Sequence, residues 1–189
     1  MRLFIMLLAF LFFGQLHAQN MPPKNFKKGS LLLLDSTRLE GFVKENIHNR
    51  ASLVFITNDW GKKKEYQGMD LLAAEIDSSR FICLRGDFFR IISEGNLEFV
   101  QKSSDASSIP SYNGNNAVFV NGTDGKPGDY FIYDTKRKEL KKLDNKNVKK
   151  LVVSIFNGYE PALTMATKAY GDIPELKEAI DLYNKHLGQ

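Results

Sequence analysis

The chain has one cysteine and three histidines among its 189 residues, and this scarcity excludes several classes of site. Cys83 has no second cysteine with which to form an intrachain disulfide, and its apolar neighbours predict a buried, unreactive thiol. His17, His48 and His186 are widely separated in the sequence. A histidine-based metal site or catalytic triad is therefore not expected.

Motifs that carry enzyme chemistry are also missing. The sequence has no Cys-x-x-Cys, His-Glu-x-x-His, Gly-x-Ser-x-Gly, Walker or Gly-x-Gly-x-x-Gly pattern, so we expect no cofactor and no resident metal. Catalysis by a pair of carboxyl groups is still compatible with the sequence. The candidates for an acid–base pair, in a hydrolase that acts on envelope polymers, are Asp70, Glu75 and Asp77, or Asp124 and Asp129. Solvated carboxylates in turns explain the same residues, and the sequence favours a protein that is not an enzyme.

Long hydrophobic runs are absent after the N-terminus. Arg2 precedes eleven apolar residues, Leu3 to Phe13, and the small residue Ala18 follows, which predicts a secretory signal peptide over residues 1–18. A spanning helix needs about 20 apolar residues, so this run is too short to cross a bilayer. We expect cleavage before Gln19 and export to the periplasm, to the outside of the cell or to the outer membrane surface. Because residue 19 is not cysteine, a lipid-anchored N-terminus is not expected.

The sequence after the signal peptide begins with two segments of different character. Residues 19–28 carry Pro22-Pro23 and few apolar side chains, which predicts a flexible leader. Residues 29–134 predict an antiparallel β body of about nine or ten short strands. Its centre is Phe81–Val100, where three aromatic and β-branched runs alternate with turn residues and indicate a β-meander.

Further strands are predicted on both sides of this meander. In the hairpin of residues 30–45, Leu39, Gly41 and Val43 share one face, so one side of its second strand should be buried. The other predicted strands are Leu53–Thr57, Lys62–Gln67 and Leu71–Ile76, then a hairpin of Ala117–Asn121 with Asp129–Asp134. No strand is predicted after Asp134.

Residues 135–189 predict a basic connector and three helices that pack on the β body. Apolar residues recur at helical spacing from Val148 to Ile155, and a second helix begins at Glu160-Pro161 with Leu163, Ala166 and Tyr170 inward. The apolar stripe of the third helix consists of Ile173, Leu176, Ile180, Tyr183 and Leu187. The predicted fold class is α+β, with an antiparallel β meander or small barrel-like body followed by three C-terminal helices.

Three short motifs each have a functional and a structural interpretation. Asn121–Asp129 offers oxygen ligands for calcium, but its spacing is not that of an EF-hand and favours a hairpin turn. Arg85-Gly86-Asp87 spells an adhesion tripeptide and also suits a strand-to-strand turn. Asp35-Ser36-Thr37 resembles the sequence at which exported Bacteroidota proteins are O-glycosylated, and Ser36 would then be the modified residue. The same three residues are equally typical of a turn.

Positive charge is concentrated in one segment, although the net charge of the chain is only +4. Lys136–Lys150 holds eight basic residues and two acidic ones. Lys146, Lys149 and Lys150 lie opposite the apolar face of the first predicted helix, so we expect them in solvent. Such a face is commonly a solvated surface, and alternatively it contacts an anionic lipid or polymer.

Several short features together resemble a group of exported proteins of unknown function from Bacteroidota. They are the Ala18-Gln19 junction, the Gly29–Val43 hairpin, the Tyr66–Leu71 step, Tyr130–Tyr133 followed by Leu140–Leu143, and the closing Ile180–Asn184. The resemblance implies compartment and architecture, and no activity. The strand layout of the N-terminal half also resembles SH3-like or Sm-like barrels, but without the RNA-binding block of Sm-like proteins, so nucleic acid is not an expected partner. We therefore expect an exported, non-enzymatic binding or structural protein of the cell envelope, with an unidentified ligand.

Overall fold

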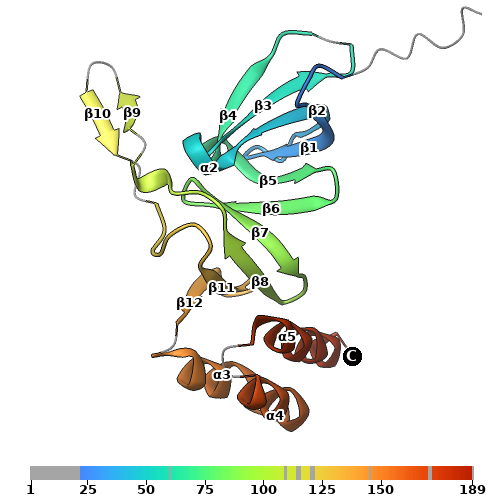
Figure 1. Ribbon diagram of the computed structural model, residues 1–189, viewed down its shortest axis with the longest axis vertical. Coiled ribbons are helices and arrows are strands. Elements are labelled where there is room, and N and C mark those ends of the chain that lie inside the picture. Colours follow the sequence, from blue (N-terminus) through green and yellow to red (C-terminus); the bar gives the residue numbers. More distant parts are fainter. Residues whose placement is uncertain are drawn as a thin grey trace, which may run out of the picture.

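The computed structural model describes residues 22–59, 61–108, 110–113, 116–119, 122–144, 146–169 and 172–188. A ten-stranded antiparallel sheet occupies the first part of the chain, and three helices follow it (Figure 1). This confirms the α+β fold class. The predicted signal peptide, Asn121 and Tyr170 lie outside the described residues.

The sheet has the strand order β12-β11-β8-β7-β6-β5-β1-β2-β3-β4. The strands are β1 Lys27–Leu33, β2 Arg38–Asn46, β3 Ser52–Thr57, β4 Lys64–Gln67, β5 Leu71–Ile76, β6 Ser79–Leu84, β7 Asp87–Ser93, β8 Leu97–Lys102, β11 Tyr130–Asp134 and β12 Glu139–Leu143. A separate hairpin of β9 Pro110–Asn113 and β10 Asn116–Phe119 projects from it (Figure 1). Short helical turns are α2 Ile47–Arg50, η1 Gly68–Asp70 and η2 Ala106–Ser108.

The predicted meander is present as β6, β7 and β8, near the middle of the sheet. The turn between β6 and β7 is built from Arg85 and Gly86, both with positive φ (51° and 88°). Glycine adopts this left-handed conformation without a steric penalty, and a two-residue turn of this kind matches the twist of the flanking strands. The local sequence therefore determines the tight reversal at the centre of the sheet.

Strands β1 to β7 curl around one apolar core, in agreement with the predicted small barrel-like body. Each of these strands contributes buried side chains, among them Leu31, Val43, Phe55, Tyr66 and Phe88. On β2 the predicted alternation is confirmed, because Gly41 and Val43 are buried while Arg38 and Glu40 are exposed. Phe88 and its neighbour Phe89 point to opposite faces, so β7 is buried on both sides.

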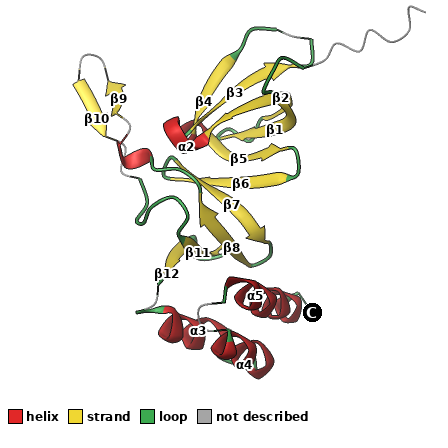
Figure 2. Cartoon of the chain, in the orientation of Figure 1, coloured by secondary structure: helices red, strands yellow, loops and turns green. Residues whose placement is uncertain are grey.

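The three helices cover one face of the sheet at β8 and β11 (Figure 2). They are α3 Val148–Phe156, α4 Glu160–Lys168 and α5 Ile173–Leu187. Phe99 and Ile132 of the sheet pack with Phe156 and Ile180 in a second core. Near the C-terminal end of α5, the side chain of Asn184 accepts a hydrogen bond from Leu97 N (3.0 Å) and donates one to Leu97 O (2.8 Å). The third helix is thus part of the packed structure, as its apolar stripe predicted, through Leu176, Ile180 and Tyr183. Leu187 of the predicted stripe is exposed instead, because it lies in the last turn beyond the core, and the side chain of Ile173 is outside the described ones.

Three predictions about strands were wrong. β-structure does not end at Asp134, because β12 adds a further strand at Glu139–Leu143. β10 pairs with β9 instead of β11, and β11 lies between β8 and β12. β1 begins at Lys27, inside the segment predicted as a leader. The strands β9 and β12 and the first residues of β1 contain polar or charged residues, so their local sequence gives a weak strand signal.

Within the residues that the structure describes, no helix is both long enough and apolar enough to cross a membrane.

Replacing Ile180 by Ala should lower the free energy of unfolding by about 2–5 kcal/mol, because a fully buried side chain is lost and a cavity remains. Leu187→Ala on the same helix is the matched control, since Leu187 is 41% exposed. Chemical denaturation of the three proteins measures this. Equal midpoints for wild type and Ile180→Ala would show that α5 is not part of the cooperative core.

Candidate binding groove

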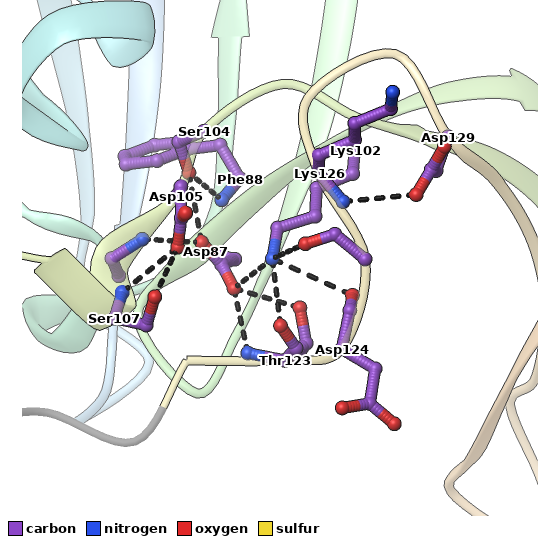
Figure 3. A network of polar contacts seen from close by, with 12 residues as sticks. Asp87, Phe88, Lys102, Ser104, Asp105, Ser107, Thr123, Asp124, Lys126 and Asp129 are labelled. Carbon is purple, nitrogen blue, oxygen red and sulfur yellow. Dashed lines mark hydrogen bonds and ion pairs between the residues drawn. The ribbon is translucent and has the colours of Figure 1, made fainter.

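A buried ion pair lies where β7 begins and β8 ends. Asp87 is the first residue of β7 and Lys102 the last of β8, and both side chains are 0% exposed. Lys102 Nζ lies 3.0 Å from Asp87 Oδ2 (Figure 3). Burial of two charges is costly unless they are paired and their remaining hydrogen-bonding positions are satisfied.

Both members of the pair have those additional partners (Figure 3). Asp87 Oδ1 accepts hydrogen bonds from Ala106 N (2.7 Å) and Ser104 Oγ (3.3 Å), and Oδ2 accepts two from the backbone and hydroxyl of Thr123 (both 2.7 Å). Lys102 Nζ donates to the carbonyl oxygens of Thr123 (2.7 Å), Gly125 (3.0 Å) and Asp124 (3.5 Å). No position is left for a substrate, so we assign the pair a structural role.

The pair fixes the two segments that lead into and out of the β9–β10 hairpin. Residues 104–106 precede the hairpin and bond to Asp87, and residues 123–125 follow it and bond to both charges. The backbone around the pair is held as well, since Lys102 N donates to Asp129 O (2.9 Å) and Gly128 N donates to Lys102 O (2.8 Å). The loop 122–129 is therefore anchored to the end of β8.

A groove of about 750 Å³ lies beside this loop, on the face of the sheet opposite the helices. Its apolar part comes from Leu84, Phe131 and Leu140, which belong to or pack on a small cluster with Phe89 and Val100. Thr123 and Asp124 form one wall. Because strand side chains alternate between faces, the same strands that supply Phe99 and Ile132 to the helix core supply Val100 and Phe131 here.

Cations outnumber anions around this groove. Arg85, Lys138, Lys141 and Lys142 line it, against Asp124 and Glu139. Lys141 Nζ lies 3.2 Å from Glu139 Oε2. Arg85 and Lys138 have no ion-pair partner in the described part of the chain.

Lys142 is engaged with Asp129, behind the loop wall. Its Nζ lies 2.7 Å from Asp129 Oδ2. The hydrogen bond from Lys142 lowers the pKa of the Asp129 carboxyl, and the same bond raises the pKa of Lys142. Both groups therefore stay charged near neutral pH, and the pair is a fixed part of the groove.

A second groove of about 380 Å³ lies on the helix side of the same strands. It runs between β8, β11 and β12 and the helices α3 and α5. Leu97, Ile132 and Tyr183 are among its apolar lining residues, and Lys136 and Arg137 are among its charged ones. Glu139 and Lys141 of β12 line both grooves, so this strand has a hollow on each face.

Among the described residues, Glu98 is the one carboxyl group on the groove face whose pKa is raised. Burial raises its pKa and the nearby charge of Glu94 adds to the effect, while its Oε2 atom is buried without a hydrogen-bond partner among the described residues. Glu98 pairs across the ladder with Tyr133, whose phenol pKa is raised by burial and then by the charge of Glu98. Glu94 itself forms an ion pair with Arg80.

The carboxylates proposed from the sequence lie in different places. Asp70 accepts a hydrogen bond from Gln67 N (2.8 Å) within η1. Glu75 and Asp77 line a separate hollow beside β1 and β2, with Glu75 3.7 Å from Arg38. Asp124 lines the 750 Å³ groove, and Asp129 is paired with Lys142. The lowered pKa of Asp129 is opposite to what a general acid requires.

The other predicted sites have the following positions. Ser36 is exposed at the β1–β2 turn with a φ of 67°, so its hydroxyl is accessible for modification, which stays a prediction. Lys146, Lys149 and Lys150 are exposed at the start of α3, as expected. Cys83 is buried, and burial raises its pKa.

Two of the short motifs are constrained by their surroundings. Asp87 of the Arg85-Gly86-Asp87 tripeptide is buried in its ion pair, so this tripeptide cannot present its carboxylate to a receptor. Among the described residues no group of three His, Cys, Asp or Glu side chains is placed to hold a metal ion.

Sequence reasoning missed the Asp87–Lys102 pair altogether. The two residues are fifteen positions apart, and Asp87 was considered only as part of the turn tripeptide Arg85-Gly86-Asp87. No local pattern shows that their side chains meet, because the meeting depends on the β7–β8 register, in which Lys102 pairs with Phe89.

Comparisons with known proteins gave no match: no protein-family model, no curated protein and no solved structure is similar to this chain.

Lys102→Ala should lower the free energy of unfolding by about 3–5 kcal/mol, because the Asp87 carboxyl group would remain buried without its partner. Lys126→Ala, an exposed lysine in the neighbouring loop, is the control and should stay within about 0.5 kcal/mol of wild type. Denaturant titration measures both. A Lys102→Ala protein as stable as the control would remove the structural role assigned to the pair.

Glu98→Gln should stabilise the protein at neutral pH. The pKa of Glu98 is raised in the folded protein. The contribution of this carboxyl group to the free energy of unfolding is therefore intact below the ordinary carboxyl pKa, where the group is neutral, and is lost as pH rises through the folded-state pKa. We expect melting temperatures of the two proteins to coincide near pH 3 and to diverge above about pH 5, with Glu98→Gln higher. Parallel curves over the whole range would show that Glu98 is not perturbed by folding.

Proposed function

We propose that this chain is a non-enzymatic binding protein of the cell envelope and that its ligand lies in the 750 Å³ groove. The observation that supports this is the combination of an apolar floor, Leu84, Phe131 and Leu140, with a rim that carries more cations than anions. Such a surface favours a ligand with an apolar part and a negative charge.

The surroundings of the groove support binding more than catalysis. Its volume is within the usual range of about 300–1,000 Å³ for ligand sites. The loop wall is held by the Asp87–Lys102 pair, so little conformational entropy is lost when a ligand docks. The carboxylates that line it, Asp124 and Glu139, are exposed, and Glu139 is already paired with Lys141, which is the environment of ordinary surface carboxylates.

An NMR titration of the ¹⁵N-labelled mature protein tests this proposal. Decanoate, below its micelle-forming concentration, should shift amide signals around the groove, such as those of Leu84, Thr123 and Leu140. Decyltrimethylammonium, with the same tail and the opposite charge, should bind at least about tenfold more weakly. Shifts elsewhere, or equal binding of the two probes, would contradict the proposal.

A matched pair of variants ties the signal to the groove. Leu140→Asp places a carboxylate on the half-buried floor and should reduce decanoate binding by about tenfold or more. Leu72→Asp makes the same change on β5 at a side chain that is 40% exposed and does not line the groove. Unchanged affinity in Leu140→Asp would place the binding elsewhere.

The envelope location is part of the proposal and rests on Arg2, the apolar run Leu3–Phe13 and Ala18. The exposed lysines 146, 149 and 150 would also allow the protein to rest on an anionic lipid or polymer of the envelope. The exported protein should begin at Gln19, which its intact mass measures. A membrane-bound form that retains Met1–Ala18 would contradict export.

A further inference from the structure

The outer edge of β12 is the end of the ten-stranded sheet. β11 is the strand that pairs with β12, and the sheet order ends there (Figure 1). We propose that this edge binds an extended acidic peptide, which adds to the sheet as an eleventh strand. The inference rests on the proposed function, because it names the class of ligand whose side chains would occupy the groove.

The backbone of β12 offers hydrogen-bonding groups on its outer side. Lys142 O accepts a hydrogen bond from the side chain of Asn147 (2.9 Å), so this carbonyl points away from β11. In an antiparallel strand, the backbone N–H and C=O groups of successive residues point alternately to one side and to the other. Leu140 is two positions from Lys142, so it presents both its N–H and its C=O on the same outer edge. Among the described residues, Asn147 supplies the one hydrogen bond to this edge, and it lies at the end next to α3.

Both faces of the edge strand have a hollow for side chains. An added strand directs successive side chains to opposite faces of the sheet. Beside β12, one set would enter the 750 Å³ groove with Leu140 on its floor, and the other would enter the 380 Å³ groove between the sheet and α3. Backbone pairing gives affinity in strand addition, and pockets for alternate side chains give specificity.

Charge around the edge indicates an acidic occupant. Lys136 and Lys138 lie in the turn before β12 and have no ion-pair partner within the described ranges. Lys141 and Lys142 lie on the strand itself and point to opposite faces, each already paired with one acid, Glu139 or Asp129. Lysines also protect exposed sheet edges from unwanted pairing, so the experiment must separate protection from recognition.

Fluorescence anisotropy with a labelled Glu-Val-Glu-Val-Glu-Val peptide tests the proposal on the full mature chain. Six residues span about 20 Å, which matches the length of β12 with its flanks. Two further peptides carry N-methyl groups on either the three valines or the three glutamates. In an added strand, the N–H groups of either the valines or the glutamates face β12. One methylated peptide should therefore lose about tenfold or more in affinity, and the other should keep it within about threefold. Equal loss in both peptides, or loss in neither, overturns strand addition.

Variants test the charge argument. Lys136→Gln with Lys138→Gln should weaken the peptide by about fivefold to tenfold, and more at low than at high salt. Lys62→Gln with Lys168→Gln removes the same charge at two exposed lysines that line neither groove and should leave the affinity unchanged. Equal weakening by both double variants, or by neither, would exclude a specific role of the edge lysines.

The two levels of the proposal fail differently. Decanoate binding in the groove without peptide binding would overturn the peptide inference and keep the proposed function, and the edge lysines would then be protective. Absence of both would overturn both proposals. A Lys-Val-Lys-Val-Lys-Val peptide that binds as tightly as the acidic one would also overturn the inference, because the charge argument requires discrimination.

Discussion

The buried ion pair between Asp87 and Lys102 is the contact on which the arrangement around the groove depends. It joins the first residue of β7 to the last residue of β8, and its remaining hydrogen bonds hold both ends of the segment that contains the β9–β10 hairpin. Charges that are fully buried stabilise a fold only when each of their polar atoms has a partner. This requirement fixes the loop 122–125 against the sheet and so forms a rigid wall for the groove.

One continuous sheet serves two different packing arrangements. In the N-terminal half the strands curl around their own core, whereas at β8 and β11 one face is covered by the helices and the other is left with a small apolar cluster. The alternation of side chains gives each face of β8 at least one buried apolar residue, with Phe99 toward the helices and Val100 away from them. Since the helices cover a single face, the groove and the free edge of β12 remain available for a ligand.

Sequence patterns predicted the strands of the central meander and all three helices, since each depends on the spacing of side chains that are near in sequence. The strand β12 was missed because Glu139, Lys141 and Lys142 give it the composition of a solvated connector, and only pairing with β11 makes it a strand. The partner of β10 was predicted wrongly. The turn residues in 122–128 predicted a hairpin of Ala117–Asn121 with Asp129–Asp134, but β10 pairs with β9, and β11 pairs with β8 and β12.

The sequence by itself determined the fold class, the exposure of Lys146, Lys149 and Lys150, and the burial of Cys83, because helical and strand periodicities directly encode which side chains face a core. The tertiary structure decided where a ligand can bind. Leu84 lies 47 positions before Phe131, and both line the groove with Leu140; the pair that supports the adjoining loop joins residues fifteen positions apart. Long-range strand register sets these contacts, and register depends on the packing of the whole sheet, which no local pattern records.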